Sequence, residues 1–221
     1  NIKLQLMKKK ILVSGTSSGL GNFLCQKCPC TKYIRKKNYE YYLRINWDVI
    51  IHCGSYAGED ITKISESIIH SFLISKLKAK KHIFISSTAV YEGSKIKKEN
   101  TKINFNQNNS LYANSKIISE SFFNFKNSLI LRLGSLVGPQ MRKNNIYKII
   151  NSKKPKISLS KKSIYSFISY EEVFNFINLS INENYNGIYN FLRNDFSTLE
   201  EICKLLNKKT VFGKFKFLCQ Q

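Results

Sequence analysis

The sequence predicts an α/β protein with a doubly wound parallel sheet and a small C-terminal lobe. Short apolar runs of β-forming residues alternate with stretches of helical periodicity, a pattern that requires right-handed crossovers and parallel pairing. A glycine-rich turn, GTSSGLG, directly follows the first apolar run, and the sequence becomes polar and basic after Pro139. The 221 residues, 43% of them hydrophobic, are enough for one full-sized domain with an added lobe.

The first strand is expected at Lys9 to Ser14, where charged residues lead into the continuous apolar run ILV. A helix should follow the glycine turn, because Leu20, Phe23 and Leu24 recur at helical spacing before Pro29 ends it.

The next strands are expected at Asp48 to Gly54, His82 to Ser87 and Ser128 to Gly134. A helix over Asp60 to Lys81 precedes the second of these strands, and a helix from about Leu111 to Phe125 precedes the third.

After Pro139 the segment MRKNNIYKIINSKKPKISLSKK indicates an excursion away from the sheet. YSFISYEEVFNFINLSI then resumes a strand and an amphipathic helix, GIYNFL adds a short strand, and TLEEICKLLNKK predicts a closing helix. Thr198 and Glu201 have the capping-box spacing at the start of that helix. We therefore divide the chain into a sheet domain, residues 1–138 with 166–192 returning to it, and a small lobe, residues 139–165 and 193–221.

The charge is strongly positive, since 36 basic and 14 acidic residues give a formal net charge of +22. Such a balance raises nucleic acid or an anionic membrane as a partner. However, the arginines are few, and phosphate and base readout favour the bidentate arginine fork; they are Arg35, Arg44, Arg132, Arg142 and Arg193. Nucleic-acid binding is therefore disfavoured, and a composition rich in Lys, Asn and Ile explains the charge equally well.

No apolar run approaches the ~20 residues that span a bilayer. The N-terminal stretch also lacks a signal-peptide pattern, because the apolar run after its lysines stops at a glycine. We expect no membrane partner and a cytoplasmic protein, with Met7 as a candidate natural start.

Cysteines are expected to be free thiols, because the chain has ample apolar residues for a core and no export signal. Cys25, Cys28 and Cys30 form a CxxCxC cluster that could offer three thiolates to zinc, but no second cluster completes four ligands. No metal site is therefore predicted.

The order strand, glycine turn, helix is typical of a dinucleotide site. Gly15, Gly19 and Gly21 let the backbone turn tightly and approach a pyrophosphate, while the helix N-terminus offers free N–H groups. The alternative is a glycine-rich turn that simply joins strand to helix. The position after the first strand favours the dinucleotide interpretation.

Tyr112 and Lys116, in YANSK, lie four residues apart on an expected helix and therefore share one face. An ammonium beside a phenol favours the phenolate and lowers a pKa that is normally near 10, so the phenol can act as a general base. Such a pair also arises by chance on a solvated helix.

A third motif, FISSTAVY from Phe84 to Tyr91, ends the third strand. In open α/β sheets ligands bind beyond the carboxyl ends of the strands, so these hydroxyl groups point into the expected crevice. Taken alone, the segment could equally be a serine-rich turn.

Together and in this order, the three motifs resemble the extended short-chain dehydrogenase/reductase family, the NAD-dependent nucleotide-sugar epimerases, dehydratases and reductases. The resemblance also includes DVIIHCGSYAG, LRLGSLVGPQ and YSFISYEEVFNFI followed by GIYNF, and covers about Lys9 to Leu206. The spacing GxxxGxG is more typical of the shorter branch of the superfamily, but the 25 residues from Ser87 to Tyr112 match the extended branch. The resemblance implies a dinucleotide-binding Rossmann domain and a substrate-binding small lobe.

By that resemblance the catalytic residues are Ser87, Tyr112 and Lys116. Tyr112 is the acid/base, Lys116 lowers its pKa and holds the cofactor ribose, and Ser87 hydrogen-bonds the reacting oxygen. The cofactor, NAD or NADP, is bound by Tyr112 and Lys116 together with Gly15, Ser17, Ser18, Gly19, Leu20, Gly21, Arg35, Cys53, Gly54 and Ser55. The implied partner is a nucleotide-sugar substrate, and a homodimer is left open.

Two positions where the sequence departs from the family's motifs reduce the number of reactions that the resemblance implies. Thr88 and Ala89 stand where dehydratases carry an Asp-Glu pair, and neither is the cysteine of reductases that also epimerise. The resemblance therefore leaves 4-keto reduction or 4-epimerisation at a sugar carbon. The alternative function is an NAD(P)-binding scaffold or sensor that has lost turnover.

The stretch from Gly21 to Asp48 is too short for the family's two strands and helix, and no acidic residue clearly ends a second strand. Instead Arg35, Lys36 and Lys37 follow the candidate second strand and suit the 2′-phosphate of NADP. A solvated lysine-rich loop is the alternative.

Overall fold

A parallel sheet forms the centre of the computed structural model, which describes residues 9–35, 38–92, 98–101, 103, 110–124 and 126–215. Within these residues the sheet has six strands in the order β2-β1-β3-β4-β5-β9, and every neighbouring pair is parallel. Their bounds are β1 Ile11–Ser14, β2 Thr31–Lys32, β3 Trp47–His52, β4 Ala79–Ser87, β5 Ser128–Leu133 and β9 Gly187–Phe191. The predicted doubly wound parallel sheet is confirmed.

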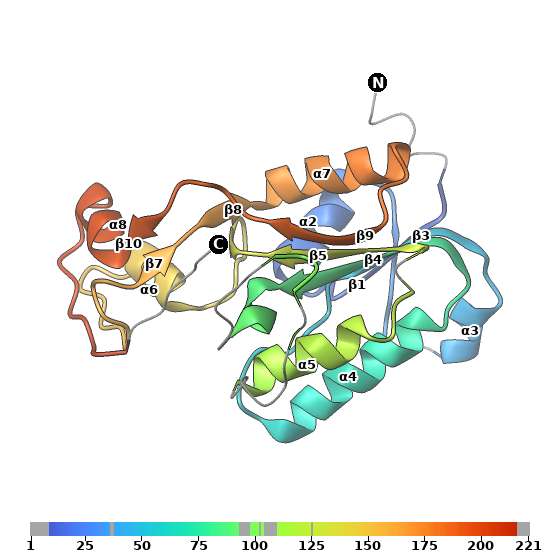
Figure 1. Ribbon diagram of the computed structural model, residues 1–221, viewed down its shortest axis with the longest axis horizontal. Coiled ribbons are helices and arrows are strands. Elements are labelled where there is room, and N and C mark those ends of the chain that lie inside the picture. The colour runs from blue at the N-terminus through green and yellow to red at the C-terminus, as the bar shows by residue number, and fades with distance from the viewer. Residues whose placement is uncertain are drawn as a thin grey trace.

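Helices cover both faces of this sheet (Figure 1). Helices α2 (Gly19–Lys27) and α7 (Tyr170–Asn182) pack together on one face, and α4 (Ile61–Ser75) and α5 (Leu111–Glu120) on the other. The short helix α3 (Tyr39–Leu43) is joined to α4 by a hydrogen bond of 2.6 Å from the Tyr39 hydroxyl to the Leu73 carbonyl.

Alternation along the strands divides the core into two layers, because successive side chains of a strand point to opposite faces. Ile11 and Val13 of β1 join the apolar cluster under α2 and α7. Leu12 lies in the cluster on the other face with Trp47, whose Nε1 donates to the Tyr42 carbonyl at 3.2 Å. Two such faces explain why the strands are nearly continuous apolar runs.

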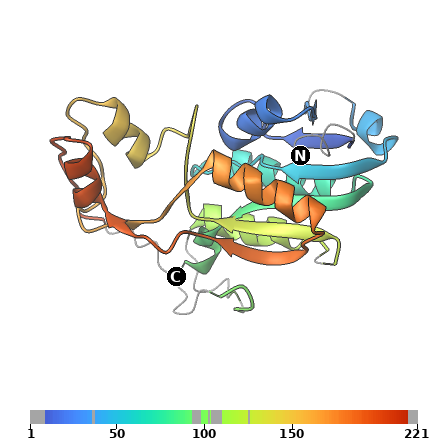
Figure 2. The same cartoon turned by 90° about the horizontal axis from the view of Figure 1, so that it is seen from above.

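The smaller lobe lies at one end of the sheet and has its own apolar cluster, which includes Ile149, Tyr165 and Leu199 (Figures 1 and 2). Its elements are α6 Asn145–Asn151, α8 Leu199–Leu205 and the antiparallel pair of β7 Ile164–Tyr165 and β10 Ser197–Thr198. Strands β6 (Ser135–Val137) and β8 (Phe167–Ser169) pair in parallel between the lobe and the sheet. The predicted capping box at the start of α8 is confirmed, with the Glu201 N–H donating to Thr198 Oγ1 at 3.2 Å and the Thr198 N–H to Glu201 Oε2 at 2.7 Å.

The structure differs from the predicted elements in several places. Helix α4 ends at Ser75 and β4 begins at Ala79, so the expected helix to Lys81 is wrong at its end. Lysines have good helix propensity, but Lys81 pairs in register with Val49. Its ammonium donates to the Ser180 carbonyl at the end of α7 at 3.0 Å and to the Tyr185 carbonyl just after the helix at 2.5 Å. Helix α5 ends at Glu120 and not near Phe125, and helices α3 and α6 were not predicted.

The short stretch between α2 and β3 contains β2 and α3. Strand β2 is only two residues long and pairs with β1, and Arg35 follows it as expected. Lys36 and Lys37 lie outside the described residues.

Candidate active site

The sheet has its switch point between β1 and β3, because the chain leaves β1 for β2 on one side and returns to β3 on the other. In open α/β sheets this is where ligands bind, beyond the carboxyl ends of the strands. Gly15 follows β1 with φ of +72°, and a Cβ added there would lie 2.5 Å from the backbone nitrogen of Gly54, which follows β3. The two glycines therefore let the strand ends approach at the mouth of the crevice.

The glycine turn continues directly into α2. Ser18 is the N-cap of the helix without a capping hydrogen bond from its side chain, and Gly19 begins the helix with φ of +60°. A Cβ on Gly21 would overlap the Gly15 carbonyl oxygen, so Gly21 packs the helix onto the turn. Leu20 is buried in the core below α2 and α7. The turn therefore divides into residues that face the crevice and residues that pack the helix.

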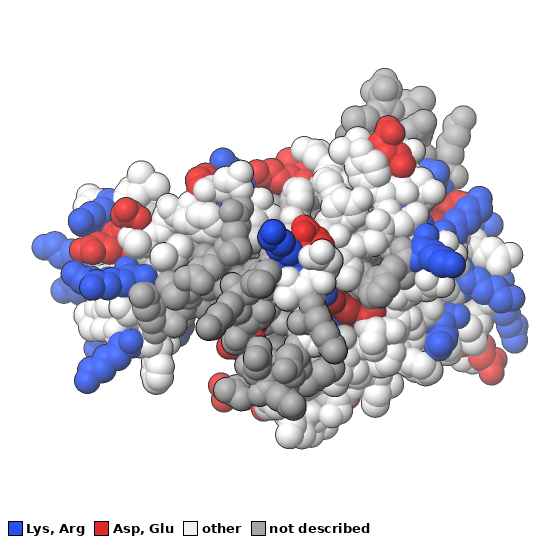
Figure 3. All heavy atoms as spheres, viewed as in Figure 1, with Lys and Arg blue, Asp and Glu red and all other residues white. Residues whose placement is uncertain are grey.

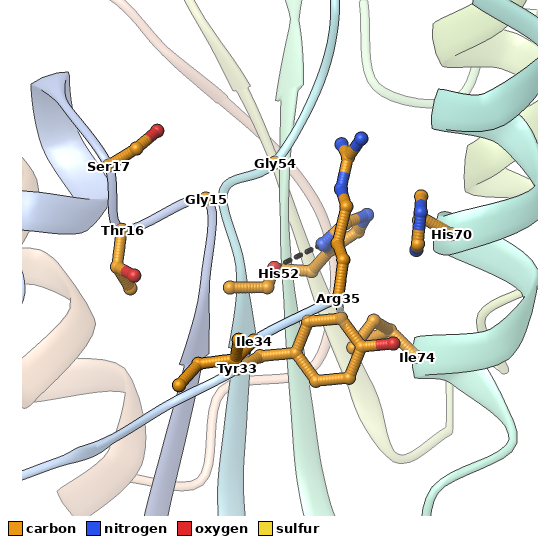
Figure 4. Close-up of a pocket in the computed structure, with 11 residues that line it drawn as sticks. Gly15, Thr16, Ser17, Tyr33, Ile34, Arg35, His52, Gly54, His70 and Ile74 are labelled. Atoms are coloured by element: carbon orange, nitrogen blue, oxygen red, sulfur yellow. Dashed lines mark hydrogen bonds between the residues drawn. The ribbon is translucent and has the colours of Figure 1, made fainter. Parts of the chain in front are cut away.

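A cavity of about 480 Å³ lies beyond the ends of β1 and β3 (Figure 4). Of the predicted cofactor residues, Gly15, Ser17, Arg35 and Gly54 line it. The other predicted cofactor residues are not among its lining residues; they are Ser18, Gly19, Leu20, Gly21, Cys53, Ser55, Tyr112 and Lys116. The lining residues that the sequence did not single out are Ser14, Thr16, Tyr33, Ile34, His52, His70 and Ile74. Apolar walls with a few polar groups and one guanidinium suit a flat heterocycle that carries an anionic group.

His52 forms the floor of this cavity and is fully hydrogen-bonded. The Ser71 hydroxyl donates to the Ser67 carbonyl at 3.0 Å, so it must accept from His52 Nε2 at 2.9 Å. The Ser14 hydroxyl then donates to His52 Nδ1 at 2.5 Å. Burial, with a smaller contribution from the Lys116 charge, lowers the pKa of His52 to about 3, so the imidazole is neutral at pH 7.

The three predicted catalytic residues lie together at the end of β4. Ser87 ends this strand and caps the 3-10 helix η1 (Thr88–Tyr91), its Oγ accepting from the Ala89 N–H at 3.2 Å. The side chains of Ser87 and Tyr112 are hydrogen-bonded to each other. Lys116 is 3% exposed, and its Nζ lies 5.9 Å from the centre of the Tyr112 ring.

Electrostatics at Tyr112 differ from the sequence expectation. Burial raises its pKa, while the hydrogen bond to Ser87 and the charge of Arg142 act in the opposite direction. The predicted lowering by Lys116 is not seen, because the Lys116 ammonium donates to the Ile85 carbonyl at 2.7 Å. Burial also lowers the pKa of Lys116 to about 8, so this lysine is still mostly protonated at pH 7 but loses its charge at a much lower pH than an exposed lysine.

The segment after β6 crosses the N-terminus of α2. The Gln140 carbonyl accepts from the Gly19 N–H at 3.2 Å, and its side-chain oxygen accepts from Asn22 Nδ2 at 2.8 Å. Arg142 donates to the Ala57 carbonyl, in the loop after β3. Nothing in the sequence pattern marks Gln140 or Arg142, because their neighbours come from distant parts of the chain.

Within the described part of the chain, no group of three or more His, Cys, Asp or Glu residues is arranged to hold a metal ion. Cys25 and Cys30 are free thiols that hydrogen-bond to each other, Cys28 is a buried free thiol, and Cys219 lies outside the described residues. No helix among the described residues is both long and apolar enough to cross a membrane.

No protein-family model and no curated protein sequence matches the chain. Solved structures do match. The dTDP-4-dehydrorhamnose reductase from Bacillus anthracis in complex with NADP is 19% identical, with 95% of this chain and 85% of that chain covered and a TM-score of 0.74. The UDP-N-acetylglucosamine 4-epimerase from Bacillus cereus is 15% identical, with coverage of 96% and 87% and a TM-score of 0.77.

A third match is MoeE5 in complex with UDP-glucuronic acid and NAD, which is 13% identical, with 94% of this chain and 86% of that chain covered and a TM-score of 0.79. At these identities the likeness concerns the path of the chain. The chain therefore has the Rossmann fold of these nucleotide-sugar enzymes, and the predicted resemblance to extended short-chain dehydrogenases/reductases is confirmed at the level of the fold.

Proposed function

We propose that the chain is an NAD(P)-dependent epimerase/reductase of the extended short-chain dehydrogenase/reductase type, acting at a sugar carbon of a nucleotide sugar. The observation that carries this proposal is the meeting of Ser87, Tyr112 and Lys116 beside the switch-point crevice. Lys116 Nζ lies 4.9 Å from the centre of the Phe84 ring, which stacks at 5.5 Å on His52, a residue that lines the cavity. The proposed catalytic residues and the cavity are therefore neighbours. The solved structures that share the fold and contain NAD or NADP support it.

The cavity suits the adenosine end of a dinucleotide. Gly15 and Gly54 present bare backbone to it, because neither carries a side chain, and Arg35 also lines it. The Gly19 N–H is held by the Gln140 carbonyl, and the next N–H groups at the N-terminus of α2 are proposed to bind phosphate beside the cavity. When bound, the nicotinamide supplies hydride transfer at the sugar carbon.

The protein's own groups then handle the proton. The Tyr112 hydroxyl gives a proton to the sugar oxygen during reduction or takes one during oxidation, and the Ser87 hydroxyl holds the same oxygen by a hydrogen bond. Lys116 leaves the Ile85 carbonyl to bind the cofactor ribose and approach Tyr112, which lowers the raised pKa of the phenol. In reduction, therefore, Tyr112 supplies the proton for each hydride delivered to the sugar.

Substrate binding is proposed for the small lobe, residues 139–165 and 193–221. Lysines gather on its surface (Figure 3), and Lys153, Lys154 and Lys156 are exposed. A positive surface on the lobe attracts the diphosphate of a nucleotide sugar. We propose 4-keto reduction ahead of 4-epimerisation, because the cavity presents Arg35, a partner for the 2′-phosphate of NADP.

The alternative function, an NAD(P)-binding sensor without turnover, is favoured by one observation. Lys116 binds the Ile85 carbonyl, and burial raises the Tyr112 pKa, so the resting arrangement is not that of an active base. The hydrogen bond between Ser87 and Tyr112 argues for the enzyme.

Two measurements test the proposal. Titration of the full chain with NAD, NADH, NADP and NADPH should show saturable binding, and a panel of nucleotide sugars and their 4-keto forms should show turnover with the preferred dinucleotide. Binding without turnover of any panel member would support the sensor. Absence of binding by all four dinucleotides would exclude both functions.

A further inference from the structure

A bidentate ion pair is buried at the end of the helix that carries Tyr112 and Lys116. Glu120, the last residue of α5, accepts from Arg132 Nη2 at 2.6 Å and from Arg132 Nε at 3.0 Å. Both side chains are almost fully buried, with 3% of Arg132 and 6% of Glu120 exposed. The other ion pairs of the described residues have at least one partner that is substantially exposed.

The carboxylate is also tied to the strand that ends in Ser87. The hydroxyl of Ser86 donates to Glu120 Oε1 at 2.5 Å. Lys116 ties the same helix to the same strand through the Ile85 carbonyl at 2.7 Å. Tyr112, Lys116 and Glu120 recur every four residues and therefore lie along one stripe of α5. Ser86 thus holds this stripe in register with Ser87, and Lys116 adds a second tie until it leaves the Ile85 carbonyl for the cofactor.

The Arg132 guanidinium connects the ion pair to η1. Arg132 Nη1 donates to the Tyr91 hydroxyl at 2.6 Å, and Arg132 lies 4.9 Å from the centre of the Tyr91 ring. Tyr91 is the last residue of η1, whose N-cap is Ser87. The Tyr91 hydroxyl donates a hydrogen bond to Asn190 Oδ1 on β9 at 2.9 Å. The network therefore joins every element that presents one of the proposed catalytic side chains.

We propose that Glu120, Arg132 and Tyr91 are positioning residues that fix the Ser87 hydroxyl relative to the Tyr112 hydroxyl. This inference rests on the proposed function for its kinetic consequence, and its structural consequence is independent of it. None of the three side chains touches the cavity, so they act through the helix and strand that they join. A misplacement of catalytic groups by about 1 Å can cost about 100-fold in rate.

A buried ion pair alone is weak evidence for stability, since replacing both partners by apolar residues is often neutral, whereas removing one partner leaves a buried charge unpaired. Comparing a variant that lacks one partner with a variant that lacks both therefore distinguishes a positioning role from a purely stabilising one. Glu120→Gln removes one partner, and the double variant Glu120→Met with Arg132→Met removes both. Tyr91→Phe breaks the link to η1 and leaves the ion pair in place.

The control is Lys81→Met. Lys81 is also a buried cation of the sheet, 5% exposed, and lies on β4 six residues before Ser87, where it binds the end of α7. The Lys81→Met substitution should lower the melting temperature and leave turnover unchanged. Each variant is measured in the full chain for kcat, KM, dinucleotide affinity and melting temperature.

For Glu120→Gln and Tyr91→Phe we expect kcat to fall by about ten- to 100-fold while KM and dinucleotide affinity stay unchanged. The double variant should recover the melting temperature but not kcat. Recovery of both, or a Glu120→Gln variant that loses only thermal stability, would overturn the positioning role.

If the wild-type chain turns over no nucleotide sugar, the proposed function fails and hydrogen exchange decides this inference. Amide exchange in α5 and η1 should rise together in Glu120→Gln and stay unchanged in Lys81→Met. A rise confined to α5 would show that the pair does not couple the two elements, and the inference would be wrong.

Discussion

Gly15 and Gly54 meet backbone to backbone where β1 and β3 end, and no side chain fits between them. A Cβ on Gly15 would lie 2.5 Å from the Gly54 nitrogen and 2.7 Å from its Cα. The glycine turn is therefore required by the fold before any ligand binds.

Gly15→Ala should destabilise the protein itself. The left-handed φ of +72° costs about 1–3 kcal/mol for a residue with a side chain, and overlap with a packed backbone adds about 1–3 kcal/mol. Gly187→Ala is the matched control, because φ is +101° there and nothing lies within 4 Å of an added Cβ. Urea unfolding should show a larger loss for Gly15→Ala. Equal losses would mean that the contact with Gly54 is unimportant.

Tyr112→Phe should abolish nearly all turnover and keep dinucleotide affinity. The change deletes the transferable proton and the hydrogen bond to Ser87 and retains the ring. General acid/base catalysis typically contributes about 10²–10⁴-fold in rate, which steady-state assays resolve easily. Tyr39→Phe is the control, since the Tyr39 hydroxyl donates to the Leu73 carbonyl at 2.6 Å, on α4. Wild-type turnover by Tyr112→Phe would remove this residue from the proposed mechanism.

Arg35→Ala should reduce a preference for NADP over NAD. Arg35 lines the cavity, and its partner among the described residues, Glu66, is 3.8 Å away with both side chains about half exposed, so the guanidinium is available to a phosphate. A charge-assisted hydrogen bond contributes about 1.5–3 kcal/mol, or about tenfold or more in the ratio of dissociation constants. Arg44→Ala, on the exposed pair with Glu40, should leave the ratio unchanged. If wild-type protein binds NAD at least as tightly as NADP, the reductase proposal gives way to 4-epimerisation.

His52 should make the fold sensitive to acid. The unfolded imidazole binds a proton near pH 6.5, whereas burial delays protonation of the folded one to about pH 3. Between these values the unfolded state holds more protons, so stability falls as the pH is lowered, by up to about 1.4 kcal/mol per pH unit. His52→Gln cannot titrate and should show a shallower loss between pH 6.5 and pH 4 in denaturant unfolding. Parallel curves for the two proteins would show that His52 is not the acid-sensitive group.

The sequence predicted most of the sheet because its signal is local. Continuous apolar runs at β1, β3 and β5, each followed or preceded by helical periodicity, determine a buried parallel strand without knowledge of its neighbours. The predicted end of α4 was wrong because the lysines that follow the helix have good helix propensity. Pairing of Lys81 with Val49 in the sheet overrides that preference.

Residues of the candidate site could be predicted from the sequence only where they belong to a short continuous motif. Ser87, Tyr112 and Lys116 come from two short motifs and lie together as expected. His70 and Ile74 line the cavity from α4, and no local pattern distinguishes them from other residues on that helix. Arg142 acts on Tyr112 from a loop 30 residues further along the chain, so its contribution depends entirely on tertiary packing.

Trp47 gives the molecule an intrinsic fluorophore that reports on one region of the sheet. It is the single tryptophan of the chain, 3% exposed, and lies in the apolar cluster with Leu12 and Tyr42, at the start of β3. Trp47 itself does not line the cavity, but its cluster includes Ile74, which does, and unfolding of the sheet exposes the indole to water. Its emission should therefore report unfolding of the β2 side of the sheet and respond to a ligand that moves Ile74, whereas the fluorescence of the reduced nicotinamide follows dinucleotide binding alone.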